Sequence, residues 1–192
     1  MIYWIGYFFW SICSFLFFPI RVIGRENLPR GACILASNHI SNLDPMIIGL
    51  VTGRRTSYMA KDSLFKKGFA WVLYAVGAYP VKRGSADIGS IRESLRRLER
   101  GEPLVLFPEG TRKKKVGAAL APHPGISLIA VKSGCLVVPV FIRNSDKVLP
   151  PGAKFLRRHA LEVIVGQGTI YRKTSSMEDI ASQIVKEIYS LA

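Results

Sequence analysis

The chain has 192 residues, a length typical of one domain. Its residues are 49% hydrophobic and 21% charged, which excludes a disordered or low-complexity protein. Lys and Arg total 27 against 13 Asp and Glu, so the formal net charge is +14, yet the mean hydropathy is +0.23. A chain that is both apolar and basic is expected to contact a polyanion: nucleic acid, an anionic membrane surface or a phosphorylated substrate.

The first twenty residues contain no charged side chain and are rich in aromatic residues. As a helix, nineteen of them would span about 28 Å, close to the hydrocarbon core of a bilayer. The run lacks the basic start and the A-x-A site of a cleavable signal peptide. Tyr and Trp crowd its first half, which suits a helix lying in the membrane interface about as well as one that spans the bilayer. The alternative is a buried core helix.

Arginines at positions 21, 25 and 30 follow the apolar run and place the rest of the chain on the cytoplasmic face of the membrane. We therefore expect residues 1–20 to be a membrane-anchoring segment and residues 21–192 to be one folded domain. All of the net charge lies in that domain. Basic clusters beside an apolar anchor favour an anionic membrane surface as partner, although any single cluster is more simply a solvated face.

Three cysteines are spread along the chain: Cys13, Cys33 and Cys135. They form no C-x-x-C pair and have apolar neighbours, which argues against a disulfide framework and against a zinc site. We expect small buried side chains in a reducing compartment.

Short apolar runs alternate with amphipathic ones from residue 32 onward, which predicts an α/β fold with a mostly parallel central sheet flanked by helices. The predicted strands are Ala32–Ala36, Thr56–Met59, Ala78–Val81, Leu104–Phe107, Leu136–Ile142 and Leu161–Val165. The predicted helices are Pro45–Thr52, Ala86–Arg100 after a Ser85 cap, Gly125–Ser133 before Gly134, and the tail from Met177 after a Ser176 cap. Ligands of such sheets bind beyond the carboxyl ends of the strands.

The segment after the first of these strands holds a candidate catalytic pair, His39 and Asp44. Residues five apart meet neither on a continuous helix nor on a strand, so the chain must turn between them. Asn and Ser residues supply the turn, and Asp44-Pro45 is a typical helix start. A carboxylate that holds the imidazole Nδ1–H leaves Nε2 free as a general base. The alternative is a turn histidine beside a helix-capping aspartate.

Two further segments place cations at predicted strand ends. In Phe107–Arg112, Gly110 permits close backbone approach, and Thr111 with Arg112 offers a hydroxyl and a guanidinium for a phosphate. Glu109 would repel a phosphate, so we expect it to orient a cation such as Arg112 or Arg83, or to accept from a neutral hydroxyl. The segment Tyr79–Arg83 again ends in cations. Taken singly, each is equally a solvent-facing basic loop.

The order of these segments resembles the 1-acyl-sn-glycerol-3-phosphate acyltransferase family, whose members carry an HX4D box. His39–Asp44 matches that box, with Asn38 in the usual preceding place, where the resemblance implies a residue that binds substrate. Gly77–Arg83 is similar to the second block, Phe107–Arg112 to the third and Val138–Val140 to the fourth, and Lys61 stands where the family usually has a lysine. The resemblance covers roughly residues 20 to 145.

The resemblance implies transfer of an acyl group from acyl carrier protein or coenzyme A to the sn-2 hydroxyl of lysophosphatidic acid. His39 would be the base, and Asp44 would fix its tautomer. Arg83, Thr111 and Arg112 would hold the acceptor phosphate, while Lys61 or a backbone N–H near Gly110 would stabilise the oxyanion. Direct transfer without an acyl-enzyme is expected, so no Ser or Cys nucleophile is required. No metal or other cofactor is expected either, and the three histidines lack the spacing of zinc ligands.

Three other functions are weighed against this one. The first is the same chemistry on another acceptor, such as glycerol 3-phosphate or another lysolipid. The second is a non-enzymatic basic protein that binds lipid at a membrane surface. The third, nucleic-acid binding, is disfavoured because the aromatic residues gather in the apolar N-terminal segment instead of interleaving with Lys and Arg.

Overall fold

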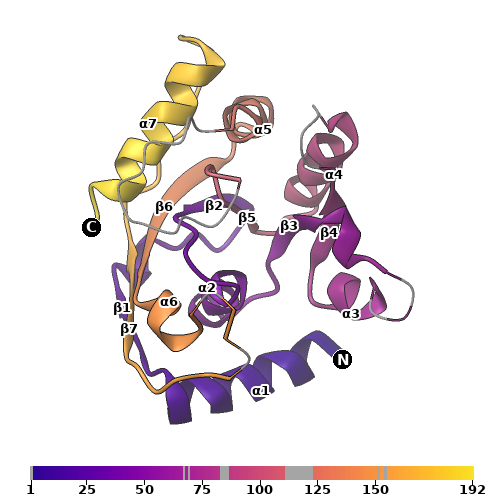
Figure 1. Cartoon of the computed structure of the whole chain (residues 1–192). Helices are drawn as coiled ribbons and strands as arrows, with labels where there is room; N and C mark the ends of the chain where they lie inside the picture. The colour runs from indigo at the N-terminus through magenta and orange to yellow at the C-terminus, as the bar shows by residue number, and fades with distance from the viewer. Residues whose placement is uncertain are drawn as a thin grey trace.

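The computed structural model describes residues 2–66, 68, 70–82, 87–110, 123–150, 152–153 and 155–192. A seven-stranded sheet in the order β1-β7-β6-β2-β5-β3-β4 forms its centre (Figure 1). Neighbouring strands are parallel except β6 and β7, so the prediction of a mostly parallel sheet is confirmed. The strands are β1 (Ile20–Ile23), β2 (Cys33–Ser37), β3 (Ser57–Lys61), β4 (Ala78–Val81), β5 (Leu104–Leu106), β6 (Leu136–Arg143) and β7 (Leu161–Val165).

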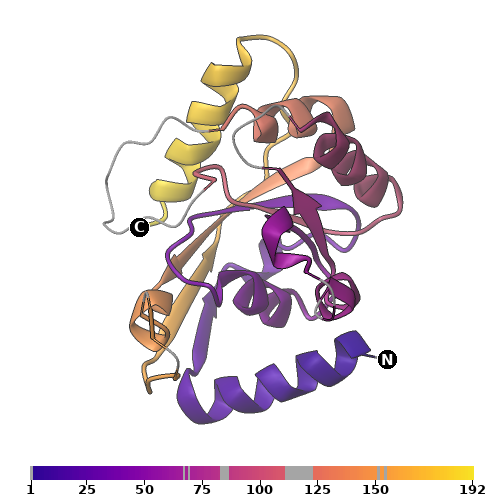
Figure 2. The ribbon, with the colours of Figure 1, turned by 45° about the vertical axis from the view of Figure 1, so that its right-hand side comes forward.

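Helices cover both faces of this sheet and create two separate apolar cores. The helices are α1 (Ile2–Phe17), α2 (Asp44–Thr52), α3 (Ala70–Ala75), α4 (Ile88–Glu99), α5 (Gly125–Ser133), α6 (Ser145–Val148) and α7 (Met177–Tyr189), with short 3-10 turns at Arg25–Asn27 and Asp62–Leu64. Side chains of α4, α5 and α7 form the core on one face. Side chains of α2, with partly buried ones from α1 and α3, form the core on the other. Figure 2 shows α1 beneath α2, on the side away from α5 and α7.

The central strands were the easiest part of the sheet to predict. Every residue of β2 and β5 is buried, and such strands appear in the sequence as continuous apolar runs. The predicted bounds are confirmed for β4 and β7, while β2, β3, β5 and β6 differ from the prediction by one or two residues at an end. The prediction missed β1, a four-residue edge strand that alternates half-buried and exposed residues and directly continues the apolar N-terminal run.

Helix ends follow the predicted signals except at α4. In α7 the Ser176 hydroxyl accepts from the Asp179 amide, and α5 ends at Gly134 in the left-handed conformation, both as expected. Asp87, not the expected Ser85, caps α4, and its carboxylate accepts from the Ser90 amide. Ser85 itself lies outside the described residues. Ser85 and Asp87 are both residue types that cap helices and lie two positions apart, so the sequence alone did not identify Asp87 as the cap.

The apolar N-terminal segment forms a helix that is shorter than expected. Helix α1 has 16 residues, Phe18 is buried in the core, and β1 begins at Ile20, so the expected boundary after residue 20 falls inside a strand. One side of α1 packs on α2 and α3, and the Tyr3 hydroxyl donates to the Arg54 carbonyl oxygen at 2.5 Å. Its other side exposes large apolar residues: Trp4, Ile5, Phe8, Phe9, Ile12, Phe15, Leu16 and Phe17. Among the helices that the structure describes, none is both long enough and apolar enough to cross a bilayer.

The three cysteines are free, and only Cys33 is fully buried, because Cys13 and Cys135 lie at partly exposed positions. Burial raises the pKa of the Cys33 thiol to about 11, so it stays protonated as a small apolar side chain.

The backbone packs closely at Gly77, just before β4, and Gly134 after α5 provides a comparison without such a contact. Gly77 and Gly134 both have positive φ, but a Cβ on Gly77 would overlap the Thr56 carbonyl oxygen, whereas a Cβ on Gly134 would meet nothing within 4 Å. We expect Gly134→Ala to lower the free energy of unfolding by about 1–2 kcal/mol, the cost of the left-handed conformation. Gly77→Ala should cost more, because strain and steric overlap add. Urea denaturation measures both, and equal losses would contradict the close approach.

Candidate active site

The candidate site lies where two neighbouring central strands, β2 and β5, end at the same edge of the sheet. The helix after β2, α2, packs in one core, and the helix after β5, α5, packs in the other. The chain therefore leaves these two strands toward opposite faces, which opens the crevice where α/β sheets bind ligands. His39 follows β2, and the segment Phe107–Gly110 follows β5.

A tight turn brings His39 and Asp44 together, and the predicted contact is confirmed. The His39 Nδ1 atom lies 2.8 Å from Asp44 Oδ2. An ionised carboxylate can only accept, so Nδ1 carries the hydrogen, and in the neutral imidazole Nε2 then has the lone pair. The His39 side chain is 14% exposed, whereas the Asp44 side chain is fully buried. The imidazole is thus held through its Nδ1 atom, and part of the ring remains exposed to solvent.

Four groups donate to the Asp44 carboxylate. The amides of Ile40 and Ser41 each donate to Oδ2 at 2.8 Å, beside the His39 nitrogen. The Ser145 hydroxyl donates to Oδ1 at 2.6 Å. These charge-assisted hydrogen bonds offset the cost of burying the carboxylate. The prediction that Asp44 caps a helix is wrong: Asp44 is the first residue of α2, its carboxylate points back into the turn, and α2 has no side-chain cap.

The residues beside His39 fix its surroundings. Asn38 is buried, and its side-chain amide donates to the Ile142 carbonyl oxygen at 2.9 Å and accepts from the Ile142 amide at 2.7 Å. This pair joins the turn to β6. The Phe107 ring stacks on the imidazole with ring centres 4.1 Å apart. Phe107 was predicted as the end of a strand, but β5 ends one residue earlier, which frees the ring to cover His39.

The loop after β5 places a buried carboxylate near the same edge. Glu109 accepts from the hydroxyl of Tyr189, near the end of α7. Burial, and then the Glu109 carboxylate, raise the pKa of Tyr189, so its hydroxyl remains a donor at neutral pH. This contact is one of the two alternatives expected for Glu109, acceptance from a neutral hydroxyl. Arg83 and Arg112, the cations considered for it, lie outside the described residues, as does Thr111.

Gly110 and Lys61 are the two residues considered for the oxyanion, and their surroundings differ. Gly110 has a φ of 64°, and its amide donates to the Phe107 carbonyl oxygen at 3.0 Å, so this N–H is engaged in a turn instead of being available for an oxyanion. Glycine stands there for the turn, since a Cβ would meet nothing within 4 Å. Lys61 is exposed at the end of β3, the strand beyond β5, and so shares the edge with His39.

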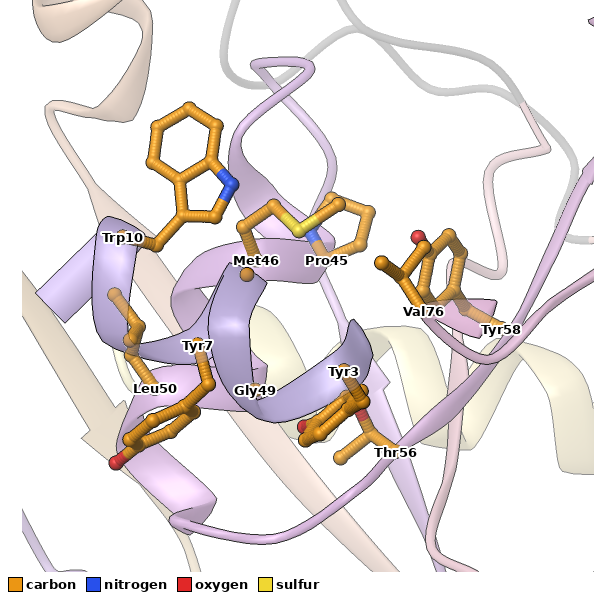
Figure 3. Close-up of a pocket in the computed structure, with 11 residues that line it drawn as sticks. Tyr3, Tyr7, Trp10, Pro45, Met46, Gly49, Leu50, Thr56, Tyr58 and Val76 are labelled. Atoms are coloured by element: carbon orange, nitrogen blue, oxygen red, sulfur yellow. The ribbon is translucent and has the colours of Figure 1, made fainter. Parts of the chain in front are cut away.

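An apolar pocket lies between α1 and α2 (Figure 3). Pro45 and Met46, which directly follow Asp44, line it from the first turn of α2. Its remaining lining residues are Tyr3, Gly6, Tyr7, Trp10, Gly49, Leu50, Thr56, Tyr58 and Val76. The Tyr58 hydroxyl is buried without a hydrogen-bond partner among the described residues, and burial raises its pKa, so it stays neutral. The lining of this small pocket is mostly apolar.

Sequence reasoning missed two hydroxyl groups of the site, those of Ser145 and Tyr189. Each lies far along the chain from the carboxylate it contacts, and neither stands in a recognisable motif. The apolar stripe of α7 did predict that this helix packs on the sheet, which brings Tyr189 near. Among the described residues, no group of three or more His, Cys, Asp or Glu side chains is placed to hold a metal ion.

Comparisons with known proteins agree on one family. The family model described as Acyltransferase matches residues 19–143. A chloroplastic 1-acyl-sn-glycerol-3-phosphate acyltransferase of Brassica napus is 28% identical over 94% of this chain and 54% of its own length. The Bacillus subtilis 1-acyl-sn-glycerol-3-phosphate acyltransferase is 32% identical over 77% of this chain and 72% of its own length. The chain thus spans about half the length of the chloroplastic relative.

A solved structure extends the agreement to the fold. The crystal structure of the 1-acyl-sn-glycerophosphate acyltransferase PlsC from Thermotoga maritima matches with a TM-score of 0.76 at 27% sequence identity. The match covers 92% of this chain and 72% of that one. The arrangement of sheet and helices described above is therefore shared with that protein.

The Asn38 amide provides a test of how the turn is held. Asn38→Leu keeps the size of the side chain but leaves the buried amide and carbonyl of Ile142 without these partners. We expect the free energy of unfolding to fall by about 2 kcal/mol or more, since each unsatisfied buried group costs roughly 1–3 kcal/mol. Hydrogen exchange at the Ile142 amide should become faster. Unchanged exchange there would contradict the two-point hydrogen bond.

Proposed function

The chain belongs to the acyltransferase family, and we propose that it transfers an acyl group from a thioester to the sn-2 hydroxyl of lysophosphatidic acid, giving phosphatidic acid. The observation that carries this proposal is the His39–Asp44 contact of 2.8 Å at the carboxyl end of β2, with the imidazole partly exposed. The names of the relatives support the acceptor. The donor is an acyl thioester of acyl carrier protein or of coenzyme A.

In the proposed reaction, His39 Nε2 takes the proton of the acceptor hydroxyl as its oxygen attacks the thioester carbonyl carbon. The new C–O ester bond forms, the C–S bond breaks, and the proton passes from the imidazolium to the departing thiolate. Asp44 keeps the hydrogen on Nδ1 and stabilises the imidazolium that forms. General-base assistance of this kind contributes about 10² to 10⁴ in rate.

The acceptor phosphate would be held by the cations of the second and third sequence blocks. We propose Arg83, Thr111 and Arg112 for this role, because a guanidinium binds phosphate through two parallel hydrogen bonds. Lys61 shares the sheet edge with His39 and would stabilise the oxyanion, since the amide of Gly110 donates elsewhere. Asn38 and Glu109 would support the site from behind, through the contacts that they make with Ile142 and Tyr189.

The exposed side of α1 supports a position at the surface of a membrane. Its large apolar side chains are continuous with the apolar lining under the same helix. We propose that this face enters the interface of an anionic membrane on its cytoplasmic side, where the basic chain is attracted, so that a lysolipid reaches the site without leaving the bilayer. Nucleic acid is not a partner in this proposal.

A second candidate is the same transfer to another acceptor, either glycerol 3-phosphate or a different lysolipid. It requires the same base and the same carboxylate partner, and only the contacts to the acceptor change. An assay that crosses both donors with lysophosphatidic acid, glycerol 3-phosphate and a neutral lysolipid separates the two candidates. A preference for an acceptor other than lysophosphatidic acid would overturn the proposed substrate.

Replacing the base tests the reaction itself. We expect His39→Ala to lower the acyl-transfer rate by at least about 10²-fold, because no other group takes the hydroxyl proton. Asp44→Asn should also lower it strongly, since the amide would favour the wrong tautomer. Binding of both variants to anionic vesicles should equal that of the parent protein. If His39→Ala retains full transfer, the general-base role is excluded; if it loses vesicle binding as well, the loss of rate has another cause.

The membrane face makes a separate prediction. Phe8 and Phe15 of α1 are 68% and 84% exposed, so they contribute little to the core. The double variant Phe8→Gln/Phe15→Gln should bind phosphatidylglycerol vesicles at least about tenfold more weakly, because burial of each ring contributes roughly 1.5–3 kcal/mol. Ile170→Gln is the control, since Ile170 is 55% exposed beside the bridge that pairs Thr169 with Val137, at the opposite end of β6 from the site. Equal vesicle binding by the double variant and the control would exclude this face.

A further inference from the structure

We infer that Ser145 is a positioning residue for the imidazole of His39, acting through the Asp44 carboxylate. This inference rests on the proposed function. Ser145 lies two residues beyond the segment that the family model matches, and no sequence block includes it. Its hydroxyl donates to Asp44 Oδ1 at 2.6 Å, and both residues are fully buried.

The two oxygens of the Asp44 carboxylate have different hydrogen-bond partners. Oδ2 faces His39 Nδ1 and the amides of Ile40 and Ser41. Oδ1, among the described residues, faces the Ser145 hydroxyl. Without that hydroxyl, Oδ1 would be a buried charged oxygen lacking this donor, and rotation of the carboxylate toward another arrangement would become favourable. The plane of the carboxylate, and therefore the direction in which Nδ1 is held, depends on Ser145.

The backbone around Ser145 is held in a way that suits this role. Asn38 binds both polar backbone groups of Ile142, near the end of β6. Asn144 then has a φ of 66°, the one positive value among non-glycine residues in the described part of the chain, and this turn directs Ser145 back toward the site. The Ser41 hydroxyl donates to the Leu149 carbonyl oxygen at 3.2 Å, just after α6.

The segment from Ile142 to Leu149 is thus tied at three points to the turn that carries His39 and Asp44. The middle tie is the only one of the three that reaches the carboxylate. Because Oδ1 belongs to the same carboxylate that holds Nδ1 of His39, the Ser145 hydroxyl both satisfies the buried charge and fixes the plane of the carboxylate. The geometry therefore assigns Ser145 to orientation of the base in addition to joining the two segments.

Kinetics and a proton resonance test this role together. In Ser145→Ala we expect kcat to fall by about 10- to 100-fold, the usual effect of a misplaced catalytic group, while KM for lysophosphatidic acid stays unchanged. The downfield Nδ1–H resonance of His39, observed in ¹⁵N-histidine protein, should shift or broaden. Ser145→Cys keeps a weak donor of similar size, so its kcat should lie between those of the parent and the alanine variant.

Ser94→Ala is the matched control, because Ser94 is equally buried in α4 and its hydroxyl donates to the Ser90 carbonyl oxygen at 2.7 Å. It should lower thermal stability to a similar degree while leaving kcat and the His39 resonance unchanged. The inference is overturned if Ser145→Ala keeps the parental kcat and resonance, or if Ser94→Ala loses as much kcat. His39→Ala, assayed in parallel, separates the two proposals: full transfer by that variant would overturn the proposed function itself.

Discussion

The structure of the site depends on the burial of one carboxylate. A charged group excluded from water is tolerated only where several donors replace its hydration. Asp44 meets this requirement with donors from the turn before it, from His39 and from Ser145 after β6. Because each donor must lie within hydrogen-bond distance of the same two oxygens, the carboxylate fixes the turn, the imidazole and the end of β6 relative to one another. The hydrogen bonds that stabilise the buried carboxylate thus also fix the orientation of the His39 imidazole.

The sheet makes this convergence possible. Strands β2 and β5 are neighbours, yet their following helices lie on opposite faces, so the residues just beyond the two strands stand where α/β sheets bind ligands. His39 and the Phe107 ring meet there although they are far apart in sequence. Continuous burial of both strands explains why they were predicted correctly: a fully buried parallel strand is one unbroken apolar run. The edge strand β1, half exposed, carries no such signal.

The parts of the site that were predicted are the local ones. A turn of five residues can be deduced from its Asn, Ser and Pro residues, so the meeting of His39 and Asp44 followed from the sequence. The contacts of Ser145 and Tyr189 could not, because serine and tyrosine hydroxyls are common and only the packing of α6 and α7 brings these two to a carboxylate. The capping role assigned to Asp44 was wrong for a related reason. Asp-Pro does begin a helix here, but burial beside His39 and the turn amides offered the carboxylate stronger partners than the helix end.

Helix α1 is part of the folded domain and also carries an exposed apolar face. The segment was predicted as an anchor separate from the folded domain, yet Tyr3 bonds to the Arg54 carbonyl, and Phe18 directly after the helix is buried in the core. The pocket between α1 and α2 begins at Pro45 and Met46, next to Asp44. A helix packed in this way cannot change its depth in a membrane without moving α2, whose first residue is Asp44. The packing of α1 on α2 therefore links the apolar face of α1 to the turn that carries His39. In the membrane position proposed above, a lipid chain held between α1 and α2 would lie beside Pro45 and Met46, next to that turn.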